Sequence, residues 1–370
     1  MVKVCHVTSA HNPEDVRIFH KECVSLAKAG YTVCLVERGE TYKKNNVSII
    51  GFGEYKGNRF GRMTKLAKRA YLAAKKSNAD IYHIHDPELL PYALKLKKQG
   101  KIVIFDSHEN TAEAILEKTW IPKLVRKLVH RVYYCFQKYV CERLDCVIVA
   151  TENMAPYFEN FSKRVVAITN FPILKEAEMP DYSSRTIVFA GGISEQWNHE
   201  NIINALNTIP NSHYILMGSA GNEYLNRLKG CHAWKNVNYL GIVNHSRVPE
   251  ELKKAAVGVA VLSYGHNTDY KVGTMGNTKI FEEMMAELPV VCTDFQLWKD
   301  FIQRYHCGIC VNPHDVDEIR KAISTLIDDP GLAMEMGKNG RLAVEKEFNW
   351  SIEEKKLVEL YKSFQLNNKG

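Results

Sequence analysis

Residues Gly273 to Pro289, which read GTMGNTKIFEEMMAELP, join a glycine-containing loop to the start of a short predicted helix. Gly273 and Gly276 allow the backbone to come close to a ligand. Asn277 or Thr278 can cap the helix, because each offers a side-chain oxygen to the free amides of the first turn. The amides and the dipole at such a helix end favour negative charge, so the stretch is a candidate anion site.

The predicted helix has an apolar face and a charged side. The apolar face, at helical spacing, holds the predicted core residues Ile280, Phe281, Met284, Met285 and Leu288. Lys279, Glu282 and Glu283 are predicted to lie off that face. The same spacing also fits an ordinary surface helix with a Lys279–Glu282 ion pair, so this stretch alone does not decide between the two interpretations.

Two polar clusters follow predicted strands in the first half of the chain. They comprise His83, His85, Asp86 and Glu88, and then Asp106, His108 and Glu109. Imidazole and carboxylate groups both bind metals, so a metal site is one interpretation. We favour hydrogen bonding to a polar ligand such as a sugar, or capping and turn roles for Asp86 and Asp106, and we expect no metal.

Two glycine-containing turns follow predicted strands in the second half. Gly191 and Gly192 end the run FAGG, and Gly218 and Gly221 enclose the turn GSAG. Each pair fits ordinary turn chemistry. Both together, facing the Gly273–Pro289 stretch, fit a nucleotide held by backbone groups.

Several function classes lack their sequence motifs. No GxGxxG follows the first strand, and neither GxxxxGK[ST] nor HExxH occurs, which argues against dinucleotide redox enzymes, P-loop kinases and zincins. Ten cysteines are scattered, mostly within apolar segments, as in reduced cytosolic proteins. Cys307 and Cys310 form a CxxC that leads into a strand, so we expect neither a redox nor a zinc role there.

The elements that must position these residues alternate along the chain as strand and helix, in two halves. Such alternation predicts an α/β fold with doubly wound parallel sheets and right-handed crossovers. Ligands bind such sheets at the carboxyl ends of the strands. We predict Rossmann-like domains over residues 1–170 and 171–350 that face a cleft, followed by a final helix within residues 351–370. The polar segment 175–185 is the best linker candidate.

Charge is unevenly distributed. The chain carries a net charge of +7, but residues 1–175 hold 29 Lys and Arg against 17 Asp and Glu. A predicted helix over residues 119–143 combines basic and aromatic side chains: Lys123, Arg126, Lys127 and Arg131 with Trp120, Tyr133, Tyr134 and Phe136. Such a helix can rest on an anionic membrane, or can be a solvated basic face over a buried aromatic one. No nucleic-acid motif is present, and neither a signal peptide nor a membrane-spanning run is expected.

Eight segments in order resemble a known family: TSAHNPEDVRIFHKECVSLAKAGYTV, HDPELLPYAL, FDSHEN, NFP, FAGGIS, YLGIV, NTKIFEEMMAELPVVCTDF and CGICVNP. Together they resemble the family 4 retaining glycosyltransferases of the GT-B fold. The resemblance spans about residues 5 to 350. It implies a nucleotide-sugar donor in the C-terminal domain, an acceptor on the N-terminal domain, retention of anomeric configuration and no metal or other cofactor. It also implies that the final helix, residues 351–370, packs back on the first domain.

The resemblance also implies residue roles. Glu282 matches the glutamate at the donor ribose, and His108 the histidine at the donor sugar, so these two are the candidate catalytic residues. The segment Gly241–Val243 matches the backbone that receives the base. The predicted donor-binding residues are Gly191, Gly192, Gly218, Gly241, Val243, Thr274, Gly276, Asn277, Thr278, Lys279 and Glu282. The predicted acceptor-binding residues are Asp15, Arg17, His20, Asp86 and Glu109.

The sequence departs from the family pattern in two ways. Thr274 stands where a glutamate often contacts the donor sugar, and Gly192 and Trp197 stand where Arg and Lys often grip the diphosphate. A diphosphate leaving group needs its developing charge stabilised. The available substitutes are Lys279, Lys271, Arg247 and the amides of residues 276–279.

We therefore expect a cytoplasmic enzyme, peripheral at the inner face of the cell membrane. It would transfer a hexose-type sugar to a lipid-linked or polysaccharide acceptor in cell-envelope glycan assembly, and would not bind nucleic acid. Two alternatives stay open. One is a GT-B nucleotide-sugar epimerase, whose turnover needs no acceptor. The other is a degenerate, non-catalytic family member that binds a nucleotide or a partner.

Overall fold

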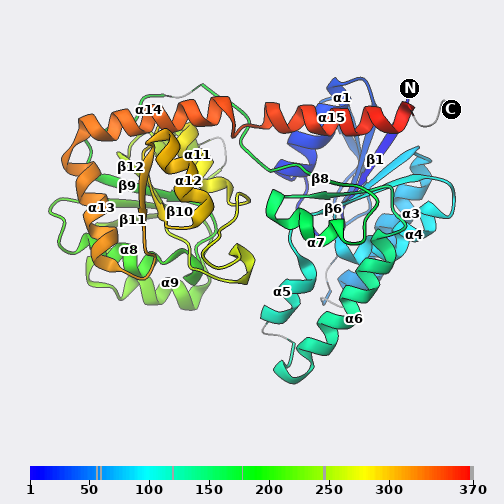
Figure 1. Cartoon of the computed structure of the whole chain (residues 1–370), viewed down its shortest axis with the longest axis horizontal. Helices are drawn as coiled ribbons and strands as arrows, with labels where there is room; N and C mark the ends of the chain where they lie inside the picture. Colours follow the sequence, from blue (N-terminus) through cyan, green and yellow to red (C-terminus); the bar gives the residue numbers. More distant parts are fainter. Residues whose placement is uncertain (56, 59–60, 119–120, 177, 245–246, 367–370) are drawn as a thin grey trace. The chain divides into compact units, whose positions relative to one another are not determined.

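The chain folds into two compact units. A computed structural model describes residues 1–370 except 56, 59–60, 119–120, 177, 245–246 and 367–370. One unit, hereafter the first unit, comprises Met1–Asn170 and Trp350–Gly370, and the second unit comprises Phe171–Asn349 (Figure 1).

The first unit is built on an eight-stranded sheet with the order β3-β4-β2-β1-β5-β6-β7-β8. Its strands are β1 (Lys3–Val7), β2 (Thr32–Glu37), β3 (Tyr42–Lys44), β4 (Val47–Gly51), β5 (Ile81–Ile84), β6 (Ile102–Ser107), β7 (Cys146–Val149) and β8 (Val165–Ala167). All neighbouring pairs are parallel except β3 with β4. The central strands are rich in Val and Ile and buried on both faces, as expected for a parallel sheet covered by helices.

Helical segments cover both faces of this sheet (Figure 1). They are η1 (Val16–Cys23), α1 (Val24–Lys28), η2 (Arg62–Leu66), α3 (Ala67–Ser77), η3 (Pro87–Leu89), α4 (Leu90–Lys97), α5 (Thr111–Glu117), α6 (Lys123–Cys141), η4 (Glu152–Met154), α7 (Ala155–Glu159) and α15 (Trp350–Leu366). The α15 residues Trp350, Leu357 and Tyr361 join a buried cluster with Ile18, on η1, and with strand residues. The prediction that the final helix packs on the first domain is thus confirmed.

The second unit has a six-stranded, all-parallel sheet with the order β11-β10-β9-β12-β13-β14. Its strands are β9 (Thr186–Ala190), β10 (His213–Met217), β11 (Val237–Gly241), β12 (Val257–Ala260), β13 (Val290–Thr293) and β14 (Gly308–Val311). Its helical segments are η5 (Glu195–Trp197), α8 (His199–Leu206), α9 (Asn222–Lys229), η6 (His232–Asn236), α10 (Val248–Leu252), η7 (His266–Thr268), α11 (Thr278–Met285), α12 (Gln296–Tyr305), α13 (Val316–Asp328) and α14 (Pro330–Lys346).

Both units are therefore Rossmann-like α/β folds, as the alternation of strands and helices predicts. The polar segment 175–185 differs from its predicted linker character. Tyr182 is buried and donates a hydrogen bond to the carbonyl of Glu287, and the Asp181 amide donates to the carbonyl of Lys253. These contacts anchor the segment within the second unit.

Candidate functional site

The loop before α11 has the shape that its glycines predict. Gly273 adopts a φ of +88°, and a Cβ there would lie 2.5 Å from the Cβ of Phe295, so a side chain is excluded. Thr274 Oγ1 accepts a hydrogen bond from the Gly276 amide, and the Trp298 indole donates to the carbonyl of Thr274. Thr274 is therefore held as part of the loop framework.

The predicted side-chain cap of α11 is not made. Asn277 occupies the position before the helix, but its side chain accepts no hydrogen bond from the first turn. Thr278 is the first helical residue and so does not occupy the capping position either. The capping expectation was wrong for both residues, and a ligand at this helix end would not compete with a side-chain oxygen for the amides.

Lys279 lies over aromatic rings at the end of β9. Its Nζ is 4.6 Å from the centroid of the Trp197 ring and 6.0 Å from that of Phe189. Burial lowers the pKa of Lys279, while the charges of Glu282 and Glu283 partly oppose this. A Cβ at Gly191 would lie 2.0 Å from Lys279 Cε, so the lysine stem crosses the backbone at the place where the chain has a glycine.

Three of the predicted glycines lie together at the carboxyl ends of β9, β10 and β11. The Gly218 amide donates to the carbonyl of Gly241 at 2.7 Å, and a Cβ at Gly218 would lie 1.7 Å from the carbonyl oxygen of Gly191. Gly192, in contrast, has no atom within 4 Å of such a Cβ. The close approach of neighbouring strand ends thus requires glycine at Gly218 but not at Gly192.

Other predicted donor residues differ in exposure. Val243 packs partly buried against a small apolar cluster, whereas Ile242 is 82% exposed. Lys271 is exposed over the ring of Tyr264, and Arg247 pairs with Glu251 at 3.9 Å. Among Lys279, Lys271 and Arg247, the three basic residues considered for the diphosphate, only Lys279 contacts the glycine-rich strand ends in the described part of the chain.

The two glutamates of α11 have opposite environments. Glu282 is half-buried, whereas Glu283 is 2% exposed and neither of its carboxyl oxygens has a hydrogen-bond partner. A Cβ at Gly258 would lie 2.7 Å from Glu283 Oε2, which shows how closely the side chain packs against β12. Burial raises the pKa of Glu283 well above its usual range. The prediction that Glu283 lies off the buried face was wrong.

In the first unit, Arg17 is a buried partner of Asp106. Its Nε and Nη2 each donate to one Asp106 oxygen at 3.0 Å, and Nη1 donates to the carbonyl of Ile168. Arg17 is 4% exposed. These contacts favour a role in positioning Asp106 over the direct acceptor contact that the sequence suggested.

Asp86 organises the loop after β1. One of its oxygens accepts hydrogen bonds from the Thr8 hydroxyl and the amides of Ser9 and Ala10, and the other lies 3.1 Å from His11 Nδ1. Burial alone would raise the pKa of Asp86, but these partners lower it well below its usual range. Burial likewise opposes protonation of His11, but Asp86 raises the pKa of His11 overall.

His108 lies beside this loop. Its ring centroid is 4.6 Å from that of His11, and its Nε2 is 3.4 Å from Asp106 Oδ2 and 3.3 Å from His85 Nδ1. His108 and His11 keep 22% and 26% of their side chains exposed. They form a partly open histidine pair above buried carboxylates.

The remaining predicted acceptor residues lie around this pair on the first unit. Glu109 is exposed, and Asp15 caps η1 by accepting hydrogen bonds from the amides of Arg17 and Ile18. His20 Nε2 lies 4.0 Å from Glu14 Oε2. Sequence reasoning missed His6, His11 and Glu22. For His6 the sequence did hold a signal, because side chains two residues apart on a strand point to the same face, so His6 lies on the same face of β1 as Val4.

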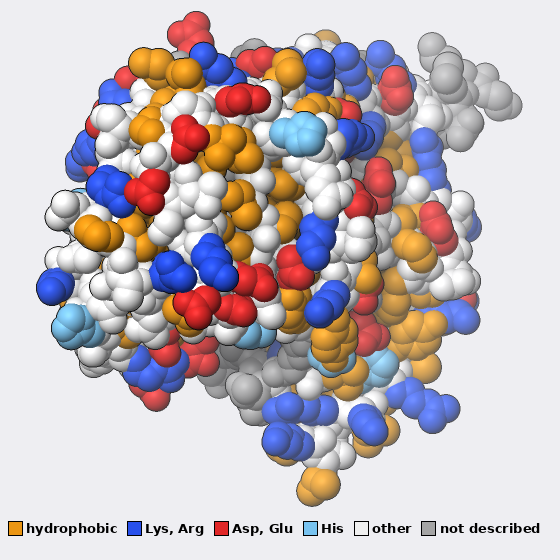
Figure 2. Space-filling view, turned by 60° about the vertical axis from the view of Figure 1, so that its left-hand side comes forward, with side chains coloured by type: hydrophobic (Ala, Val, Ile, Leu, Met, Phe, Trp, Pro, Cys, Tyr) orange, Lys and Arg blue, Asp and Glu red, His pale blue; other side chains and the backbone are white. Residues whose placement is uncertain are grey.

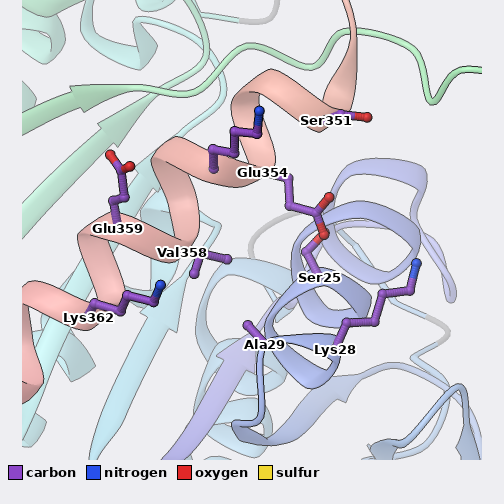
Figure 3. Close-up of a pocket in the computed structure, with 9 residues that line it drawn as sticks. Ser25, Lys28, Ala29, Ser351, Glu354, Val358, Glu359 and Lys362 are labelled. Carbon is purple, nitrogen blue, oxygen red and sulfur yellow. The ribbon is translucent and has the colours of Figure 1, made fainter.

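A surface pocket of about 400 Å³ lies elsewhere on the first unit, between α1 and α15. Figure 3 shows charged side chains of Lys28, Glu354 and Lys362 around it. None of the predicted site residues lines this pocket, and its flexible charged walls make it a poor candidate for a specific site.

Comparison with known families decides the identity of the fold. Residues 16–171 match the model of Glycosyltransferase Family 4, and residues 171–343 match that of Glycosyl transferases group 1. The chain belongs to the family 4 glycosyltransferases. The two matches meet at residue 171, where the second unit begins. No curated protein sequence matches the chain.

Solved structures of similar fold include several glycosyltransferases. Sucrose-phosphate synthase from Thermosynechococcus elongatus is 17% identical, with a TM-score of 0.79 over 99% of this chain and 100% of that chain. Anabaena HepE, solved with UDP and glucose, is 13% identical, with a TM-score of 0.73 over 98% and 100%. WaaG, a glycosyltransferase involved in lipopolysaccharide biosynthesis, is 14% identical, with a TM-score of 0.70 over 96% and 98%. The predicted GT-B fold is confirmed.

A search of the described residues for membrane spans found no helix that is both long enough and apolar enough to cross a bilayer.

Proposed function

We propose that this glycosyltransferase transfers a hexose-type sugar, with retention, from a nucleotide-diphosphate donor bound in the second unit. The observation that carries the proposal is the meeting of Gly191, Gly218 and Gly241 at adjacent strand ends, with Lys279 laid across Gly191. A diphosphate can approach closely where the backbone carries no side chains, and a half-buried cation such as Lys279 can offset its charge. Anabaena HepE, of the same fold, was solved with UDP and with UDP-glucose.

Departure of the nucleoside diphosphate is the step that the second unit must assist. When the sugar–phosphate bond breaks, negative charge develops on the diphosphate, and fixed positive groups lower the barrier most. We assign this role to Lys279 and to the first-turn amides of α11, which the Asn277 side chain does not cap. Glu282 would hold the ribose and the segment 241–243 the base. This chemistry draws on no metal ion.

We place the acceptor on the first unit, beside the histidine pair His11 and His108. Their partly exposed rings stand over Asp86 and Asp106, which are buried and fully engaged with protein groups. Such a surface offers directional polar contacts to sugar hydroxyls. Following the family resemblance, His108 would contact the donor sugar.

We propose further that the acceptor is lipid-linked or a polysaccharide of the cell envelope, reached by docking on the inner face of the membrane. The support is an apolar stripe on α6, formed by Leu124, Leu128 and Val132, which are 97%, 63% and 61% exposed. Lys123, Lys127 and Arg131 are exposed beside it. Figure 2 shows hydrophobic and basic side chains together on the lower projection of the surface. An exposed apolar stripe flanked by cations is typical of helices that lie on anionic membranes.

The aromatic side chains of α6 agree with the other interpretation of this helix, in which a solvated basic face lies over aromatic side chains that face inward. Tyr133, Tyr134 and Phe136 are half-buried, and aliphatic side chains form the exposed stripe instead. Arg126 is half-buried rather than exposed, and its Nε donates a hydrogen bond to the carbonyl of Ile121. Trp120 lies outside the described residues.

Transfer with retention is tested by product analysis. The protein is incubated with a nucleotide sugar and a lipid-linked acceptor in mixed micelles, and the anomeric configuration of the new linkage is read from the proton NMR coupling constant. We expect nucleoside diphosphate release that depends on acceptor, and a product with the donor's configuration. Inverted product, or sugar isomerisation without any acceptor, would contradict the proposal; the latter would indicate an epimerase.

A further inference from the structure

Beneath the histidine pair, three other imidazole groups share one face of the first sheet. His6 and His83 are register partners on the adjacent strands β1 and β5, and His85 follows His83 by two residues. Residues two apart on a strand point to the same face. Glu22, on η1, comes down onto this face from the helical layer. Side chains from three separate segments thus converge.

The four side chains are fully enclosed and mutually close. Each has 0% of its side chain exposed. Glu22 Oε2 lies 3.7 Å from His6 Nδ1, 3.9 Å from His83 Nε2 and 3.8 Å from His85 Nε2. His6 Nδ1 and His85 Nε2 are 2.9 Å apart. One carboxylate oxygen therefore faces three ring nitrogens.

Protein groups leave much of this cluster unsatisfied. Among the residues that the structure describes, neither oxygen of Glu22 accepts a hydrogen bond, and His83 Nε2 also has no hydrogen-bond partner. A cation lies close by: Arg17 Nε is 3.1 Å from Glu22 Oε1 but donates its hydrogen bond to Asp106. Leaving several buried polar atoms unpaired is costly, and native proteins rarely do so without a bound water or ion.

We propose that His6, Glu22, His83 and His85 bind one divalent transition-metal ion, with zinc as the best fit. Imidazole and carboxylate are both zinc ligands. Zinc–ligand bonds of about 2.0–2.1 Å place tetrahedral ligand atoms roughly 3.3 Å apart. The distance between His6 Nδ1 and His85 Nε2, 2.9 Å, is shorter than that value. The distances from Glu22 Oε2 to the three histidine nitrogens, 3.7–3.9 Å, are longer, so small side-chain rotations can make room for the ion.

The outer contacts of the histidines match those of metal ligands. His83 Nδ1 lies 2.8 Å from the Tyr361 hydroxyl, and His85 Nδ1 lies 3.4 Å from Asp106 Oδ2. Such partners fix the tautomer and leave the opposite nitrogen free to bind a metal.

Four protein ligands with no solvent exposure leave no position for substrate. The ion would therefore be structural, linking β1, β5 and η1, and through Tyr361 also α15. It plays no part in the sugar transfer proposed above, which draws on Lys279. Because the site is closed, we expect the ion to be taken up during folding rather than by the folded protein.

The test is metal analysis of the full chain. The protein is unfolded with a chelator, refolded with and without Zn²⁺, dialysed, and analysed by plasma mass spectrometry. We expect about one zinc per chain after refolding with metal, and a higher Tm than for the metal-free protein. Refolding with Co²⁺ should give the visible absorption of a tetrahedral site. Less than about one tenth of an equivalent, with no change in Tm, would overturn the proposal.

Variants locate the ion. Glu22→Gln and His83→Gln should each lower bound zinc at least tenfold at limiting metal. The matched control is His199→Gln, which removes a buried histidine that also pairs with a tyrosine hydroxyl, at 2.9 Å, but in the second unit. Zinc retained by both cluster variants, or lost equally from the control, would place the ion elsewhere. If a variant does not fold, the Co²⁺ spectrum of the unmodified chain still shows whether the ion lies in a tetrahedral site. Adventitious surface sites do not give the strong visible absorption of tetrahedral Co²⁺.

Discussion

Lys279 lies where the glycine-rich strand ends and the first turn of α11 meet. Its stem crosses Gly191, and its ammonium group is held over Trp197. Replacing Lys279 by alanine should lower kcat by roughly 10²-fold, the loss typical when one donor to a developing anion is removed. Steady-state kinetics at saturating donor measures this. Lys254→Ala, which removes an exposed lysine paired with Glu251, is the control. Unchanged kcat in Lys279→Ala would exclude the assigned role.

The His11–Asp86 pair predicts a specific pH dependence. The pKa of His11 is raised and that of Asp86 is lowered, in both cases against the effect of burial. The pair therefore stabilises the fold fully between about pH 4 and pH 6.5, the unperturbed values. This stabilisation is lost as pH rises through the folded pKa of His11, and as pH falls through that of Asp86.

Asp86→Asn checks the origin of this shift. Without the carboxylate, only the charges of Asp15 and Asp106 oppose the effect of burial, so the pKa of His11 should fall from its raised value. Titration of the His11 ring protons by NMR measures it. Glu109→Gln, a change at an exposed carboxylate that does not contribute to the His11 shift, should leave the pKa unaltered. A pKa that stays raised in Asp86→Asn would show that another group controls His11.

Single residues show where sequence reasoning reached its limit. The glycine-rich turns were found from the sequence pattern and the role of Lys279 from the family resemblance, and the structure brings Gly191, Gly218 and Lys279 together. Arg17 was expected to bind the acceptor, because neither periodicity nor composition shows that Asp106, 89 residues away in sequence, is its partner. Glu283 was expected outside the core, because a charged residue at a buried helix position contradicts the usual pattern.

At the scale of elements, α6 carries a prediction about the membrane. Replacing Leu124, Leu128 and Val132 together by serine removes the exposed apolar stripe while leaving the basic side chains. We expect binding to anionic vesicles to weaken at least about tenfold, because electrostatic attraction alone gives weak, salt-sensitive association. Vesicle co-sedimentation measures this. Leu72→Ser, at a leucine 47% exposed on α3, is the control. Equal binding by the triple variant would contradict docking through α6.

Elements were easier to predict than their details. Apolar runs such as VKVCHVT and the alternation with helices were enough to predict parallel sheets, because strands buried on both faces have nearly continuous apolar sequences. For α6 the sequence left two interpretations open, and the half-buried aromatic side chains agree with the one that places them beneath a solvated basic face. Tyr134 turns inward because it packs against Tyr157 and Phe161, and such tertiary contacts are not visible in the sequence of a single helix.

At the scale of the whole molecule, the last helix completes the core of the first unit. Leu357 is fully buried in the cluster that also holds Ile18 and strand residues. Leu357→Ala should lower the free energy of unfolding by about 2–5 kcal/mol, the usual cost of such a cavity. Chemical denaturation measures this. Glu359→Ala, at an exposed position on the same helix, should change it by less than about 0.5 kcal/mol. A small effect at Leu357 would mean that α15 is not part of the cooperative core.

The two-fold repeat of the strand–helix pattern indicated two domains, and the resemblance in eight segments indicated the family. The metal-ligand cluster could not be assembled from sequence. His6 and Glu22 lie in segments with ordinary strand and helix patterns. The register of β1 with β5 places His6 beside His83, and the packing of η1 on the sheet brings Glu22 to the same cluster.

Donor binding by the second unit tests the central claim most directly. The unfolding temperature of the full chain is measured with UDP, GDP, ADP, CDP and their sugars. We expect one nucleoside diphosphate and its sugar to raise the Tm, with about 2.7 kcal/mol of stabilisation at a concentration of 100 Kd. Lys279→Ala should weaken that binding at least about tenfold. A chain whose Tm responds to none of these compounds would not be a nucleotide-sugar glycosyltransferase.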